Sequence, residues 1–107
     1  MKIIYNNIIP FKGFKAINLF GVLFVRKNSV LSGIDMNHER IHTAQMREML
    51  YMFFYLWYVV EWLIRLIQYR NSHKAYRNIC FEREAYTMQN KCTYLEQRKH
   101  YAWRKFL

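Results

Sequence analysis

The stretch Ser32-Gly-Ile-Asp-Met-Asn-His-Glu-Arg-Ile-His42 decides how this chain folds. Ser32 and Asp35 have the spacing of a capping box, in which two side chains hydrogen-bond the free backbone amides at the start of a helix. We therefore expect a helix to begin near Gly33 and to run towards Glu48. The sequence before this point has no helical spacing, so the stretch also marks a change from strands to helices.

The same stretch contains His38-Glu-Arg-Ile-His42, which matches the HExxH pattern at every fixed position. Residues four apart share one face of a helix, so His38 and His42 can each direct a ring nitrogen at one metal ion. Glu39 lies one step around the helix, where it can take a proton from a water at that metal. The pattern opens a helix that has its own start signal, which favours a zinc site over a chance match.

The segment before this helix, residues 3–25, is rich in Ile, Phe, Val and Leu. It is interrupted by Pro10 and by glycines, as short strands joined by turns would be. We expect two or three short strands within residues 1–31. Residues 21–26 are our candidate for an edge strand that pairs with an extended substrate peptide.

After the first helix, residues 49–67 contain only two charged side chains, Glu61 and Arg65, which stand four apart as a helical ion pair would. We expect a long apolar helix here. Its uninterrupted apolar run, residues 49–60, is shorter than the about 20 residues that a membrane span requires. We therefore expect a central buried helix whose aromatic face rests on a membrane interface. That face comprises Phe53, Phe54, Trp57 and Tyr58.

A catalytic zinc site needs a third protein ligand and an open position for water. Asp35 is the only aspartate in the chain, and Glu48 lies about 9 Å further along the helix axis, turned away from the histidines. Glu61 is expected to pair with Arg65, and Glu96 lies in a basic stretch where a solvated salt bridge is the ordinary explanation. Glu82 and Glu84 remain, at the start of a last helical region that we expect from about Tyr76 onward. An antiparallel return of the chain would bring either glutamate beside the histidines.

The segment Phe81-Glu-Arg-Glu-Ala-Tyr86 resembles the F-E-x-x-A-D segment of the membrane-associated CAAX-processing and heat-shock zinc peptidases, which are gluzincins. The resemblance implies that His38, His42 and Glu82 hold a zinc ion. It also implies that Glu39 acts as the general base.

The resemblance departs at Tyr86, where those peptidases have an aspartate that orients a zinc ligand. Glu84 or the hydroxyl of Tyr86 would have to take over that task. If Glu84 were the ligand instead, the dipeptide Glu84-Ala85 would resemble the Asn-Glu-Ala segment of thermolysin-like enzymes. We prefer Glu82. The continuation His42-Thr-Ala-Gln45 is similar to small bacterial HExxHxxQ domains of unknown function. Tyr76 and Tyr86 are candidate donors to a developing oxyanion.

The composition favours an anionic partner surface, because the formal net charge is +10 and 53% of the residues are hydrophobic. The basic residues follow no nucleic-acid-binding motif, so we expect a membrane surface and consider nucleic acid unfavoured. Cys80 and Cys92 are too far apart for a CxxC pair, and we expect free thiols. The N-terminus lacks the pattern of a cleaved signal peptide, which favours a cytoplasmic location at the inner membrane surface.

Together these observations predict one α+β domain over residues 1–107, a minimal zincin-like fold with a small N-terminal β-sheet followed by three helices in residues 33–107. The predicted function is a zinc-dependent metallopeptidase that hydrolyses a short or disordered peptide, or that needs a protein partner to complete its site. One alternative is a catalytically inactive zinc-binding structural or regulatory module. The other is a basic membrane-surface adaptor in which HExxH is accidental.

Overall fold

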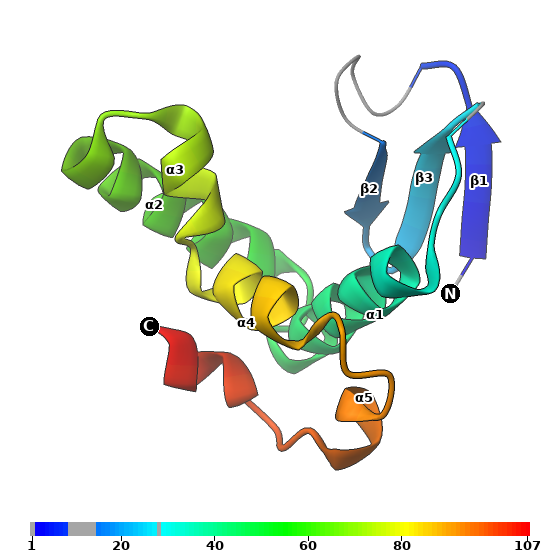
Figure 1. Cartoon of the computed structure of the whole chain (residues 1–107). Coiled ribbons are helices and arrows are strands. Elements are labelled where there is room, and N and C mark those ends of the chain that lie inside the picture. Colours follow the sequence, from blue (N-terminus) through cyan, green and yellow to red (C-terminus); the bar gives the residue numbers. More distant parts are fainter. Residues whose placement is uncertain (1, 9–14, 28) are drawn as a thin grey trace.

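The computed structural model describes residues 2–8, 15–27 and 29–107 of the chain (Figure 1). A small three-stranded sheet comes first and helices follow, so the predicted α+β class is confirmed. The sheet packs beside the first helix, and the later helices extend away from it on the other side (Figure 1).

The sheet consists of β1 (Lys2–Asn6), β2 (Ala16–Leu19) and β3 (Val22–Arg26), in the order β1-β3-β2. Strand β3 pairs parallel with β1 and antiparallel with β2. Phe20 and Gly21 form the two-residue turn between β2 and β3, and both have positive φ angles, 54° and 85°. Turns of this kind match the twist of paired strands and favour glycine. The prediction that residues 21–26 form an edge strand is therefore wrong: β3 is central, and β2 is an edge.

Helix α1 (Gly33–Glu48) begins where the sequence predicted, and both hydrogen bonds of the capping box are present. The Ser32 hydroxyl accepts from the Asp35 amide at 3.1 Å, and the Asp35 carboxylate accepts from the Ser32 amide at 3.0 Å. Lys15 also pairs with Asp35 at 2.6 Å, which ties the start of the helix to the sheet.

The apolar helix α2 (Met52–Tyr69) starts three residues later than predicted and is turned by 110° from α1. Leu50 and Tyr51 have positive φ angles of 53° and 59°, which no helix continues through. The helix is not centrally buried, because Phe54 and Glu61 are its two buried residues. Within the described ranges, no single helix is long and apolar enough to cross a membrane, whereas the bent pair of α1 and α2 passes the same test.

The remaining chain forms α3 (Ser72–Arg77), α4 (Cys80–Met88), α5 (Tyr94–Gln97) and a final 3₁₀ turn, η1 (Ala102–Phe106). The prediction of three helices is therefore too low for the described part of the chain. Helix α3 begins four residues before Tyr76, where the last helical region was expected to start, because the Asn71 side chain caps it by accepting from the Lys74 amide at 2.9 Å.

The helical core holds α1 and α4 together. Phe54 of α2 stacks on Phe81 of α4, with ring centroids 4.6 Å apart, and the Trp103 ring packs edge-on against Phe81. The buried residues of this core are Met46, Phe54, Ile79, Cys80, Phe81 and Trp103. Because Phe81 is anchored in this core, the neighbouring residue Glu82 faces α1.

Candidate metal centre

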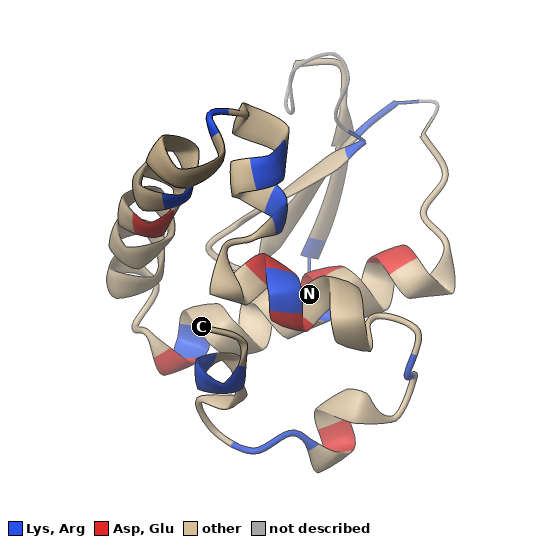
Figure 2. Ribbon diagram, turned by 60° about the vertical axis from the view of Figure 1, so that its left-hand side comes forward, with Lys and Arg blue, Asp and Glu red and all other residues tan. Residues whose placement is uncertain are grey.

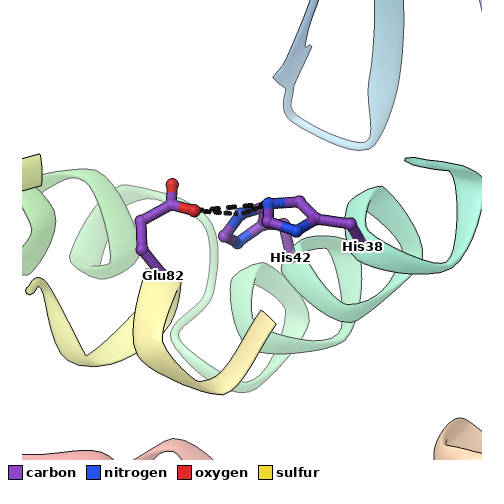
Figure 3. A group of neighbouring side chains, drawn as sticks. All are labelled: His38, His42 and Glu82. Atoms are coloured by element: carbon purple, nitrogen blue, oxygen red, sulfur yellow. Dashed lines mark hydrogen bonds and ion pairs between the residues drawn. The ribbon is translucent and has the colours of Figure 1, made fainter. Parts of the chain in front are cut away.

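Helices α1 and α4 bring two histidines and one glutamate together in the interior (Figure 3). The Nε2 atoms of His38 and His42 are 3.1 Å apart. The Oε1 atom of Glu82 lies 3.3 Å from Nε2 of His38 and 3.1 Å from Nε2 of His42. The three atoms form a nearly equilateral triangle, and all three residues are buried.

The size of this triangle fits a metal ion. Bonds from zinc to His nitrogen and carboxylate oxygen are about 2.0–2.1 Å, so ligand atoms in tetrahedral positions are about 3.3 Å apart. The observed separations of 3.1–3.3 Å differ from that value by at most a few tenths of an ångström. His38, His42 and Glu82 could therefore hold a metal ion.

The second ring nitrogen of His42 is held by Gln45, which is fully buried one turn along α1. Nδ1 of His42 lies 2.8 Å from Oε1 of Gln45. The amide nitrogen of Gln45 donates to the Phe81 carbonyl and to the Glu84 carboxylate, each at 3.0 Å. Because the amide nitrogen of Gln45 donates both of its hydrogen bonds to these groups, its amide oxygen faces His42. Nδ1 of His42 must therefore donate to this oxygen. Nε2 is then free to offer its lone pair to a metal ion.

Comparable partners hold the other two side chains. Nδ1 of His38 lies 2.8 Å from Oε1 of Gln89. Asn37 donates to the backbone carbonyl of Gln89 at 2.9 Å and so holds the turn after α4 against α1. The Tyr58 hydroxyl of α2 donates to Oε2 of Glu82 at 2.7 Å. Partners of this kind orient metal ligands and fix the tautomer of histidines.

Glu84, the alternative third ligand, points away from the histidines. Its carboxylate is fully buried and accepts from Tyr94 at 2.6 Å and from Arg98 at 2.5 Å. Arg98 also pairs with Glu48 at 2.9 Å. The structure therefore brings Glu82, and not Glu84, beside His38 and His42, and Glu48 is turned away as predicted.

The electrostatics of the group favour a positive charge at its centre. Burial acts to lower the pKa of His42, but Glu82, together with Glu39 and the hydrogen bond to Gln45, outweighs it and raises that pKa to about 9. Burial acts to raise the pKa of Glu82, and the two histidines and Tyr58 outweigh it and hold that pKa well below its usual range. Without a metal ion, a proton on His42 supplies the charge that the buried carboxylate requires.

Beside this group lies a cavity of about 490 Å³. Glu39 is half-buried in its wall, and burial raises the pKa of its carboxyl group. The sheet edge β2 forms another part of the wall: Asn18 donates to the Glu39 carbonyl at 3.1 Å and to Thr43 at 2.9 Å. The residues that line the cavity are Ile8, Ala16, Ile17, Asn18, Leu19, His38, Glu39, His42, Met46, Phe54, Tyr55, Tyr58, Tyr76 and Glu82.

The two candidate oxyanion donors lie near the group but differ in position. The hydroxyls of Tyr76 and Tyr86 are 2.9 Å apart, and Tyr76 lines the cavity. Tyr86 instead places its ring edge-on against the His38 ring, with centroids 4.5 Å apart. Where the resemblance implies an aspartate that orients a ligand, this chain uses Gln89, three residues further on, to bind the His38 ring.

Several residues of this site were missed in the sequence. Gln45 follows His42 by three residues and was visible as part of an HExxHxxQ pattern, so its contact could have been proposed from helical spacing. Tyr58 and Gln89 carry no local signal, because their contacts join different helices.

Comparison with known protein families, curated proteins and solved structures finds no match for this chain.

Proposed function

We propose that this chain is a zinc-dependent metallopeptidase in which His38, His42 and Glu82 hold the zinc ion and Glu39 is the general base. The observation that carries the proposal is the buried triangle of ligand atoms, each of whose side chains is oriented by a further hydrogen bond, beside an open cavity. Two imidazoles and one carboxylate are the ligands of one class of catalytic zinc site.

The number of protein ligands supports a catalytic role for the zinc ion over a structural one. Structural zinc sites are closed by four protein ligands, usually including cysteines, whereas catalytic sites keep one position open. Among the described residues the group offers three ligands, and the cavity adjoins it. Cys80 and Cys92 are free thiols outside the group.

A zinc ion held by these residues would act as a Lewis acid: it would polarise a peptide carbonyl and lower the pKa of a water molecule bound to it. Glu39 takes a proton from the attacking water and passes it to the leaving amine. Its pKa is raised by burial, which brings a carboxylate closer to the pH at which proton transfer in both directions is efficient. Tyr76 supplies a hydroxyl to the wall of the cavity, where it can donate to the oxygen of the reacting carbonyl.

The substrate that fits is a short or disordered peptide with an apolar side chain. Leu19, Met46, Phe54 and Tyr55 give the cavity an apolar lining. Strand β2 is an edge, and an extended peptide can pair with an edge strand through main-chain hydrogen bonds.

The test is zinc stoichiometry followed by turnover. We expect about one zinc per chain, by the ligand number of such sites, in the wild type and in the exposed control variants His73→Ala and Glu96→Ala. His42→Ala and Glu82→Ala should lose stoichiometric zinc. Protein that takes up no zinc would rule out the proposal.

The second candidate function is a zinc-binding module without activity. It is favoured by one observation: a neutral amide, Gln89, binds His38 where a carboxylate would raise ligand basicity more strongly. Glu39→Gln separates the two functions. In an enzyme this variant keeps its zinc and loses cleavage of a peptide library, whereas a module shows no cleavage in either form.

A further inference from the structure

Helix α2 presents an exposed aliphatic stripe to the outside. Six residues that recur at helical spacing form it and are 47–78% exposed: Met52, Leu56, Val59, Val60, Leu63 and Ile67. We call this set the α2 stripe. All residues of α2 are described, and its two charged residues, Glu61 and Arg65, lie off the stripe. At 1.5 Å per residue the stripe follows a helix about 27 Å long.

A patch of this extent is unusual for a surface in contact with water alone. Exposed contiguous apolar patches of more than a few hundred Å² mark sites of interaction. The stripe also borders a groove of about 530 Å³, in which Leu56 and Val60 face the last residue, Leu107. The opposite side of α2 contacts the metal centre through Tyr58. The stripe therefore does not help to build the metal centre.

Basic side chains lie at the C-terminal end of the stripe and in the segment that leads into the groove. Arg70 is the C-terminal cap of α2, and Lys74 of α3 lies with its ammonium group 5.0 Å from the Tyr69 ring. Figure 2 shows basic positions, in blue, on α3 and on the link between α2 and α3. Arg104 and Lys105 are exposed in η1, three and two residues before Leu107, which lines the groove beside α2.

Most acidic side chains do not offset these charges on the outside. Glu61, at the edge of the groove, is buried and accepts from Arg65 and from the Cys80 amide. Glu48 and Glu84 are buried against Arg98. The net charge of +10 is therefore carried mainly at the surface.

We propose that the α2 stripe binds the surface of an anionic lipid bilayer, with α2 lying in the plane of the interface and the neighbouring basic residues at the headgroups. Two interactions bind such helices to a bilayer. Aliphatic side chains are buried at the boundary between headgroups and acyl chains, and cationic side chains are attracted to anionic headgroups. A second copy of the chain fits less well, because two surfaces of high positive charge repel each other. Binding through the stripe is independent of the metal and of peptide cleavage.

The experiment is sedimentation of the full chain with vesicles of phosphatidylcholine, with and without roughly one part in four of phosphatidylserine. Wild type should bind the anionic vesicles and bind the neutral ones much more weakly. Raising the salt from about 0.1 M to about 1 M shortens the screening length from about 10 to about 3 Å and should weaken this binding.

Leu56→Gln/Leu63→Gln removes two side chains of the stripe and should weaken binding at least about tenfold. Val30→Gln/Ile34→Gln is the matched control, because Val30 and Ile34 are 79% and 45% exposed away from α2 and should leave binding unchanged. Thermal unfolding verifies that both variants fold. Absence of vesicle binding by wild type overturns the proposal, as does equal binding by the Leu56→Gln/Leu63→Gln variant. A dimer in sedimentation analysis that this variant converts to monomer, without vesicle binding, assigns the stripe to a second copy instead.

Discussion

Replacing Gln45 by methionine tests how the metal centre is oriented. The change keeps the length of the side chain and removes three hydrogen bonds: one with His42, one to the Phe81 carbonyl and one to Glu84. The His42 ring then loses the acceptor that fixes its tautomer. Loss of such a partner typically weakens metal affinity about 10- to 100-fold.

The same change should reduce the free energy of unfolding. Each net hydrogen bond contributes about 0.5–1.5 kcal/mol, and a buried polar group left without a partner costs about 1–3 kcal/mol. Gln45 is fully buried, so water does not replace it. We expect a loss of about 2–4 kcal/mol in the metal-free protein.

The assay is competition with a chromophoric zinc chelator for affinity, and urea denaturation with and without zinc for stability. Gln97→Met, at an exposed position of α5, is the matched control and should change neither quantity. A Gln45→Met variant that folds and binds zinc within threefold of wild type would refute the reasoning, because the His42 tautomer would then not depend on Gln45.

Three further predictions follow from the same contacts. Tyr58→Phe removes the donor to the buried Glu82 carboxylate and should weaken zinc binding about tenfold in the chelator assay. It should also cost about 1–3 kcal/mol of stability in the metal-free protein. Because the pKa of His42 is raised to about 9, the metal-free ring holds a proton below that pH. Zinc affinity should therefore rise about tenfold per pH unit between roughly pH 7 and 8, and calorimetry in two buffers should detect about one released proton. Arg98→Met leaves two buried carboxylates without their cation and should cost about 3–5 kcal/mol in urea denaturation.

Each of these has an outcome that contradicts it. Unchanged affinity in Tyr58→Phe would show that the hydroxyl does not orient Glu82. A flat pH dependence of zinc affinity would mean that His42 is already neutral. An Arg98→Met variant as stable as the exposed control Arg40→Met would mean that Glu48 and Glu84 take up protons without cost.

The sequence by itself determined the features that depend on neighbours along the chain. The start of α1 at Gly33 follows from the capping box, whose two hydrogen bonds join residues three apart. The shared face of His38 and His42 follows from helical geometry alone. The ion pair of Glu61 with Arg65, at 3.3 Å, lies one turn apart on α2 and was predicted for the same reason.

Tertiary structure alone decided which glutamate meets the histidines and which strand forms the edge. Glu82 and Glu84 share the short helix α4, and the choice depends on Phe81 entering the core and on Arg98 binding Glu84 from a distant segment. Strand β3 is central because it pairs with β1 as well as with β2, which no local pattern indicates. The contacts of Gln89 with His38 and of Tyr58 with Glu82 likewise cross between helices. Local hydrogen bonds and periodicity can be read along a chain, whereas these choices depend on how separate elements pack against one another.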